Sequence, residues 1–252
     1  MPITAILSMK GGTGKTTTAC NLGAALAERG QKVLLVDLDP QGSLTYIFRD
    51  RIAAGKTLAD LLLHDAEMPE VVREIGSSKL QLLPADIELL SVELKDRSRR
   101  LATRLRDHLR GARRRYDHIL IDGPPSLDAL SLQALIAADQ VLVPIHAAPL
   151  AHHALELFDR EVTELRRQKL HSAKLLGIVF TQFNPYLNLT AEVVGQVRST
   201  FRDLVFRTVI RSTVRLAEAP LRGKTIFEYQ ASSLGSDCYR QLRKEFQRRL
   251  EA

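Results

Sequence analysis

Residues Leu7–Asn21 read LSMKGGTGKTTTACN, which nearly matches the phosphate-binding pattern G-x-x-x-x-G-K-[ST]. The end of the pattern, GKT, is present at residues 14–16, but Met9 stands where the first glycine belongs. The glycines lie further along the loop, and a second lysine, Lys10, stands just before them. The stretch therefore predicts a phosphate-binding loop with one additional cation.

The loop has the sequence context of a nucleotide-binding site. It follows the strand-like segment TAILSM and precedes a helical pattern that begins near Lys15. Its glycines let backbone N–H groups approach phosphate oxygens, and the helix N-terminus adds partial positive charge. Lys15 is suited to the β- and γ-phosphates and the Thr16 hydroxyl to Mg²⁺. The loop is therefore expected to bind a nucleoside triphosphate with Mg²⁺.

Short apolar segments alternate with helical patterns along the 252 residues. The strand-like segments are ITAILSM, KVLLVD, HILID, QVLVPI, LLGIVFTQF and VFRTVI. The helical patterns cover residues 16–30, 130–138, 152–168, 191–201 and 236–252. This alternation predicts an α/β fold of the P-loop NTPase class, with a mostly parallel sheet and helices on both faces. No linker or repeat interrupts the pattern, so we expect one domain over residues 1–252. The region 43–84 is less regular, and only one short helix, KTLADLLL, is expected in it.

Three aspartates follow strand-like segments. Asp37 and Asp39 lie in LLVDLDPQG, and Asp122 ends HILID. Ligands of parallel sheets gather at the carboxyl ends of strands, so these carboxylates are expected near the phosphate loop. There they are suited to the water shell of Mg²⁺ and to orienting an attacking water.

The composition is that of a basic globular protein, with a formal charge of +7. Residues 97–115 contain nine arginines and one acid, and their leucines recur every four residues. This spacing predicts an amphipathic helix whose basic face is solvated or contacts a polyanion.

No apolar run approaches 18 residues, so no stable membrane insertion is expected. The C-terminal stripe formed by Tyr239, Leu242, Phe246 and Leu250 fits packing on the sheet better than binding to lipid.

The chain resembles the ParA/Soj partition ATPases, which belong to the deviant-Walker-A group with MinD. The resemblance is carried by KGGTGKTTTACNLGAALAERGQKVLLVDLDPQG and YDHILIDGPPSLDALSLQALIAADQVLVPI, and it continues through LLGIVFTQFNPYLNLT and TVIRSTVRLAEAPLRGKTIFEY. It implies an ATPase that uses ATP and Mg²⁺, forms a homodimer with ATP, binds non-specific DNA and is stimulated by a ParB-like partner. It also implies a cytoplasmic, nucleoid-associated protein.

The resemblance assigns roles to individual residues. Lys10 looks like the signature lysine that reaches the partner subunit's nucleotide, where it acts as an arginine finger does. Lys15 and Asp39 are the other catalytic residues, and Asp39 positions the water. Thr16, Asp37 and Asp122 are the implied metal site, Asp37 being the weaker assignment. The nucleotide-binding residues implied are Lys10, Gly11, Gly12, Thr13, Gly14, Lys15, Thr16, Thr17, Arg211 and Thr213.

The sequence departs from the family where the base and DNA are expected. The family's IPRNVRL reads IRSTVRL here, so Arg211 replaces a proline and Thr213 an asparagine. Tyr186 stands where relatives often carry an arginine used on DNA. Arg215 is retained, and with Arg222 and Lys224 it forms the expected DNA-binding set.

The proposed role is a switch for chromosome or plasmid segregation. The alternative is a related positioning ATPase for another cargo, such as a protein organelle, or a MinD-like positioner at a membrane. Only nine residues precede Lys10, so we expect no N-terminal helix-turn-helix domain and no site-specific DNA recognition.

Overall fold

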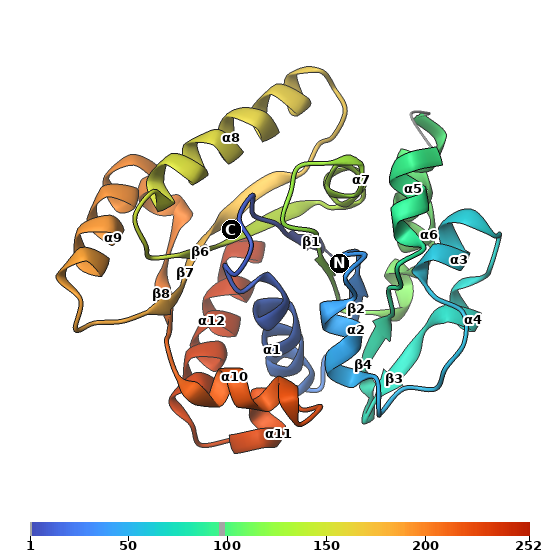
Figure 1. Ribbon diagram of the computed structural model, residues 1–252, viewed down its shortest axis with the longest axis horizontal. Coiled ribbons are helices and arrows are strands. Elements are labelled where there is room, and N and C mark those ends of the chain that lie inside the picture. The colour runs from blue at the N-terminus through green and yellow to red at the C-terminus, as the bar shows by residue number, and fades with distance from the viewer. Residues whose placement is uncertain (1, 96–98) are drawn as a thin grey trace.

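Eight strands form one sheet in the computed structural model, which describes residues 2–95 and 99–252 (Figure 1). The strands are β1 (Ile3–Ile6), β2 (Val33–Asp37), β3 (Arg73–Ile75), β4 (Ser77–Leu83), β5 (His118–Asp122), β6 (Gln140–His146), β7 (Lys174–Phe183) and β8 (Val205–Arg211). Their order is β3-β4-β2-β5-β1-β6-β7-β8. All neighbours are parallel except β3 and β4, which are antiparallel. The expected α/β class with a mostly parallel sheet is confirmed.

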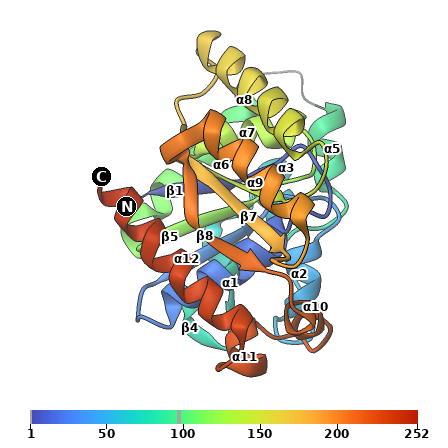
Figure 2. The ribbon, with the colours of Figure 1, turned by 90° about the vertical axis from the view of Figure 1, so that its left-hand side faces the viewer.

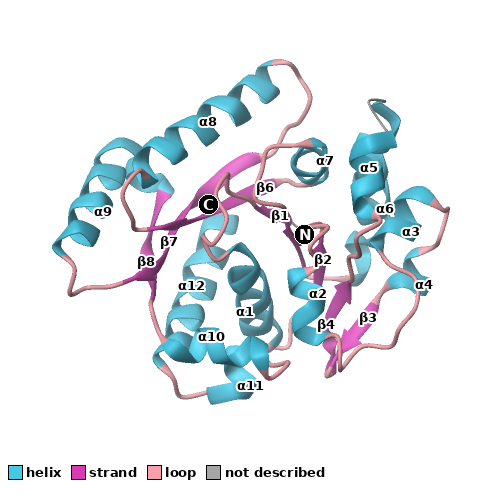
Figure 3. Cartoon of the chain, in the orientation of Figure 1, coloured by secondary structure: helices cyan, strands magenta, loops and turns pink. Residues whose placement is uncertain are grey.

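Helices cover both faces of the sheet (Figures 2 and 3). They are α1 (Lys15–Ala27), α2 (Ser43–Phe48), α3 (Leu58–Leu63), α4 (Met68–Val71), α5 (Leu89–Lys95), α6 (Arg99–Ala112), α7 (Ala129–Ala137), α8 (Ala151–Arg167), α9 (Asn188–Phe201), α10 (Val214–Leu221), α11 (Ile226–Gln230) and α12 (Leu234–Glu251), with short 3₁₀ turns η1 (Arg113–Arg115) and η2 (Arg202–Leu204). In Figure 1, α7 and α8 lie above the sheet, and α1 and α12 lie below it.

The strands are buried on both faces, as their continuous apolar sequence requires. In β2, Leu34 and Val36 belong to the core cluster under α3 and α5–α9, while Val33 and Leu35 belong to the cluster with α1 and α12. Alternate side chains of a strand point to opposite faces, so each strand contributes to both cores. The resulting three layers bury β1, β2 and β5 in the middle of the sheet.

The strand order places the expected functional residues at one edge. β1 lies between β5 and β6, and β2 lies next to β5. The loop after β1 leads directly into α1, and the chain leaves β2 and β5 at the same edge of the sheet. This carboxyl edge is where ligands of parallel sheets bind.

The region 43–84 contains more structure than the sequence pattern indicated. The expected helix near KTLADLLL is α3, but α2, α4, β3 and β4 also form there. β4 pairs with β2 in parallel, and β3 is a three-residue edge strand with an irregular register against β4. Short edge strands carry too few alternating residues for their sequence to indicate them.

Two expected helices are present with their apolar faces buried. α6 covers most of the arginine-rich stretch, and its Leu105 and Leu109 are fully buried, while residues 97 and 98 and the side chain of residue 101 lie outside what the structure describes. In α12, Tyr239, Leu242 and Phe246 are at most 1% exposed. The interpretation of the C-terminal stripe as core packing is therefore confirmed. Within the described part of the chain, no helix combines the length and apolarity that crossing a bilayer requires.

Candidate nucleotide-binding site

The loop between β1 and α1 adopts a conformation that requires glycine. Gly12 and Gly14 have φ angles of 72° and 82°, in the left-handed region that side chains disfavour. Gly14 is also the residue immediately before α1, so the loop ends at the positive end of that helix. This is the geometry of an anion-binding site built from backbone N–H groups.

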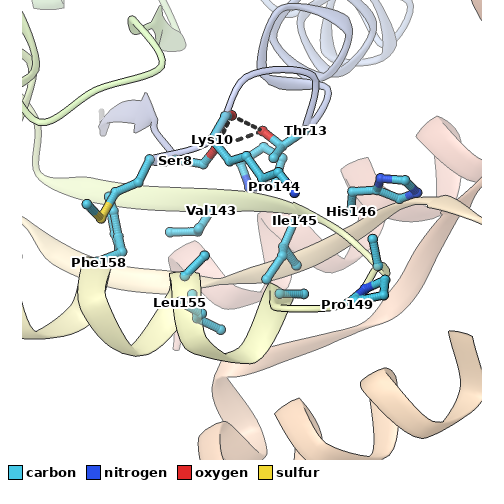
Figure 4. Close-up of a pocket in the computed structure, with 14 residues that line it drawn as sticks. Ser8, Lys10, Thr13, Val143, Pro144, Ile145, His146, Pro149, Leu155 and Phe158 are labelled. Carbon is cyan, nitrogen blue, oxygen red and sulfur yellow. Dashed lines mark hydrogen bonds between the residues drawn. The ribbon is translucent and has the colours of Figure 1, made fainter. Parts of the chain in front are cut away.

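The loop is closed by bonds to one carbonyl oxygen. The Lys10 carbonyl accepts hydrogen bonds from Ser8 Oγ at 3.2 Å, Thr13 Oγ1 at 3.3 Å and Lys15 Nζ at 3.3 Å. The Ser8 and Thr13 hydroxyls are themselves 2.7 Å apart (Figure 4). The two hydroxyls share two protons among these contacts, and together with Lys15 Nζ they hold the backbone at Lys10, although the Lys10 side chain is exposed.

The two lysines of the loop occupy different environments. Lys15 is 6% exposed, and burial lowers its pKa, while Asp122 and Asp39 act in the opposite direction. The Lys10 ammonium is exposed and, among the described residues, makes no hydrogen bond or ion pair. Lys15 is thus part of the interior of the site, whereas Lys10 is exposed and lies at the edge of the cavity between the loop and α8.

Two residues of β7 hold the loop from the other side. Thr181 Oγ1 donates to the Thr13 carbonyl at 2.7 Å, and Gln182 Nε2 donates to the Gly12 carbonyl at 2.5 Å. Neither residue was expected at the site from the sequence. Their only sequence signal is that two polar residues occur near the carboxyl end of an otherwise apolar strand.

Asp37 and Asp122 are direct neighbours in the sheet register and are both fully buried. Burial raises the pKa of Asp37 to about 6. Burial, followed by the charge of Asp37, also raises the pKa of Asp122 well above its usual value. Two buried carboxylates side by side are unfavourable unless a cation or a proton compensates them.

The hydrogen bonds of Asp37 are local. Its Oδ2 accepts from the backbone N–H and the hydroxyl of Thr45, both at 2.7 Å, and its Oδ1 accepts from the Asp39 N–H at 3.3 Å. Asp37 therefore fixes the start of α2 and the backbone of Asp39. This bonding adds a structural role to the metal-site role that the resemblance implied.

Asp122 is the carboxylate that fits a magnesium site best. Neither of its oxygens has a hydrogen bond of ordinary geometry within the described residues, although Thr16 and Lys15 favour its ionised form. Mg²⁺ in nucleotide sites is held by one or two carboxylates, water and the phosphates themselves. The described residues contain no group of three or more His, Cys, Asp or Glu that could hold a metal ion. The residues present therefore fit Mg²⁺ beside Thr16 and Asp122.

A cavity of about 260 Å³ opens beside the start of α1 and has the position expected for the base. It is lined by Gly14, Thr17, Thr181, Gln182, Ile210, Arg211, Ser212, Thr213, Leu216, Ala217 and Tyr239. Arg211 and Thr213 both line this cavity, and their contact with the base stays a prediction. The Thr213 hydroxyl accepts a bond from the Arg215 N–H at 3.3 Å and so also begins α10.

A second, apolar cavity of about 30 Å³ lies between the phosphate loop and α8 (Figure 4). Met9, Val143, Ile145, Leu155 and Phe158 contribute to its wall. Its volume suits about one water molecule, and its lining offers that water few polar partners. We interpret it as a packing gap behind the loop.

The residues expected to bind DNA lie on and just after α10. Arg222 and Lys224 are exposed. Arg215 is paired with Glu218 at 2.8 Å, and Glu218 also accepts a bond from the Tyr229 hydroxyl. The charge of Arg215 is therefore partly neutralised by its neighbour. Tyr186 is 86% exposed in the loop before α9.

Known proteins match the chain over nearly its full length. A family model described as an AAA domain matches residues 1–175. The sporulation initiation inhibitor protein Soj of Bacillus subtilis is 37% identical over 250 residues, which cover 96% of this chain and 97% of that protein.

Solved structures with a similar fold also match nearly the whole chain. Apo McdA of Cyanothece has a TM-score of 0.87 and 25% identity, and the match covers 99% of both chains. Cobyrinic acid a,c-diamide synthase of Mycobacterium smegmatis, solved with an ATP analogue and magnesium, has a TM-score of 0.83 and 29% identity over 100% of this chain and 96% of that one.

Proposed function

Because the chain belongs to the ParA/Soj family of partition ATPases, we propose that it is an ATP-driven switch that segregates chromosome or plasmid DNA. ATP binding forms a dimer that holds non-specific DNA, and a ParB-like partner triggers hydrolysis and release. The protein then acts in the cytoplasm on the nucleoid.

The position of Lys10 carries this proposal. Its carbonyl lies within hydrogen-bonding distance of Ser8, Thr13 and Lys15, whereas the residue is exposed and its ammonium has no partner within the described part of the chain. A cation held ready at the rim of a phosphate site is suited to a nucleotide in a second subunit. There it stabilises the charge of the transition state as an arginine finger does, so that nucleotide binding and dimerisation become one equilibrium.

The other residues act within their own subunit. Lys15 and the loop N–H groups bind the phosphates, and Asp39 orients the attacking water. Thr16 and Asp122 hold Mg²⁺, which when bound neutralises charge on the β- and γ-phosphate oxygens. Asp37 keeps the Asp39 backbone in place through the 3.3 Å bond from the Asp39 N–H.

Lys10→Ala is expected to abolish the ATP-dependent dimer while leaving nucleotide binding within about threefold of wild type, because only the charge delivered to the partner is removed. Size-exclusion chromatography with light scattering, under ADP, ATP and a slowly hydrolysed analogue, measures the mass. Wild type should be monomeric with ADP and dimeric with the analogue. A variant dimer as stable as that of wild type would contradict the proposal.

The DNA-binding part of the proposal rests on exposed charge beside the base cavity. Arg222 and Lys224 are exposed at the end of α10 and just after it, and Leu216 and Ala217 of the same helix line the cavity. Lysine and arginine contacts to phosphate give binding that is nearly independent of sequence and falls steeply with salt. A dimer would present this cation pair twice.

Arg222→Ala combined with Lys224→Ala is expected to weaken ATP-dependent DNA binding by about tenfold or more and to reduce the salt slope by about four, since the dimer loses four phosphate contacts and each removes about one. Biosensor binding to random-sequence duplex between 50 and 200 mM salt measures both. The matched control removes two exposed arginines of α8, Arg160 and Arg167. If the control variant weakens binding as strongly, the surface has been assigned wrongly.

A positioning ATPase for another cargo remains the second candidate. The likeness to McdA in fold and length favours it. The membrane version is less favoured because the C-terminal apolar stripe is buried in the core. Cosedimentation of the ATP state with DNA or with anionic liposomes separates the candidates.

A further inference from the structure

Gln182 has an unusual backbone and an unusual contact. It is one of the few described non-glycine residues with a positive φ, at 50°. Its side-chain amide donates to the Gly12 carbonyl, 170 residues earlier in the chain. Strained backbone conformations persist where the surrounding structure holds them, and they are frequent at functional sites. The same residue is thus strained and bonded to the phosphate loop.

The hydrogen bond from Gln182 to the Gly12 carbonyl affects the direction in which N–H groups of the loop point. In a planar trans peptide the C=O and the next N–H point in opposite directions. Gln182 holds the Gly12 carbonyl toward β7, and Thr181 holds the Thr13 carbonyl toward β7. The N–H groups of Thr13 and Gly14 therefore point away from β7. Gly12, at φ 72°, has no Cβ to restrict its own backbone, so these bonds are what hold its carbonyl in this direction.

Gln182 also borders the base side of the site. It lines the 260 Å³ cavity with Arg211 and Thr213, while its amide reaches the phosphate loop. Thr181, its neighbour, is 3% exposed and bonds the loop from the interior. Gln182 is exposed, and its link to the phosphate loop is made by its side-chain amide.

We propose that Gln182 is a positioning residue for ATP hydrolysis, which orients the Thr13 N–H toward the phosphates by holding the Gly12 carbonyl. The proposal rests on the assignment of the loop as the site of ATP. Gln182 itself transfers no proton and makes no covalent bond. Its contribution is a loop whose donors are aligned before the transition state forms.

Two variants separate the contact from the backbone strain. Gln182→Met keeps the length of the side chain but removes the donor. Gln182→Asn keeps an amide that is one methylene too short to reach Gly12, and asparagine tolerates positive φ well. Both are expected to lower kcat about tenfold and to raise the Kd for the magnesium complex of a slowly hydrolysed ATP analogue about threefold. The thermal midpoint should stay near the wild-type value for Gln182→Met and equal or exceed it for Gln182→Asn.

Phosphate release, isothermal titration and thermal denaturation give these three readouts, with Gln196→Met on α9 as the matched control. A purely structural role predicts that Gln182→Asn restores kcat along with stability, and that result would overturn the proposal. Wild-type kcat and Kd in Gln182→Met would overturn it as well. If wild type itself failed to bind the analogue, the nucleotide assignment would be refuted instead, which is a distinguishable outcome.

Discussion

Lys15→Ala is expected to lower ATP hydrolysis by a factor on the order of 10³, because the lysine is the cation inside the phosphate site. The Lys15 side chain is 6% exposed and lies close enough to Asp122 and Asp39 for their charges to act on its pKa. It is therefore held inside the loop that we propose binds the β- and γ-phosphates. Nucleotide affinity should fall about 10- to 100-fold, which corresponds to the loss of charge-assisted bonds worth about 1.5–3 kcal/mol. Phosphate-release kinetics and titration with a slowly hydrolysed analogue measure the two effects.

Asp39→Ala is the matched control for this prediction. It removes a residue at the same edge of the sheet whose expected role is to orient water, whereas that of Lys15 is to bind phosphate. Hydrolysis should fall by a similar factor, but the affinity for the analogue should stay near that of wild type, since the proposed role of Asp39 is to orient water and not to bind the phosphates. Thermal denaturation must show both variants folded. A Lys15→Ala variant with unchanged affinity would show that the phosphates bind elsewhere.

Gly177→Ala is expected to destabilise the fold by about 3 kcal/mol or more, the largest stability effect we expect from a single methyl group. Gly177 has φ 156° and lies where the register of β6 and β7 shifts by one residue. A Cβ there would lie 2.5 Å from the Leu204 carbonyl oxygen, 2.7 Å from the Phe206 ring and 2.9 Å from the Arg249 guanidinium. The carbonyl belongs to the backbone and cannot rotate away as a side chain can.

The surroundings of Gly177 make relaxation costly. The Arg249 guanidinium donates to the Asp203 carbonyl at 2.8 Å and to the Val205 carbonyl at 2.9 Å, and it lies 4.1 Å from the centre of the Phe206 ring. Moving it would break these bonds between α12 and the start of β8. Urea unfolding monitored by circular dichroism measures the loss.

Gly195→Ala is the control for the glycine prediction. Gly195 lies within α9, and no atom lies within 4 Å of the position of its Cβ. Alanine is favoured over glycine inside helices by about 1 kcal/mol, so this variant should be equally or more stable than wild type. Equal stability of the two variants would contradict the steric argument for Gly177.

Much of the fold was predictable because local sequence patterns and global structure agree here. The phosphate loop follows β1 and begins α1, as the spacing of its glycines and Lys15 predicted. The strand segments were recognisable because central parallel strands are apolar on both faces. β3 and β4 were missed because three and seven residues with mixed polarity carry little periodic signal, and pairing with β2 is what stabilises them.

The sequence indicated which residues lie near the phosphate loop, but not the contacts that those residues make. The sequence alone determined the loop, the acids at the ends of β2 and β5, and Arg211 and Thr213 at the end of β8, since each belongs to a recognisable local pattern. Only the tertiary structure decided that Asp37 and Asp122 are adjacent and that Gln182 reaches Gly12. The physical reason is that motif spacing reports backbone conformation over a few residues, whereas these contacts depend on strand order. Strand order is fixed only when the two cores close around the sheet.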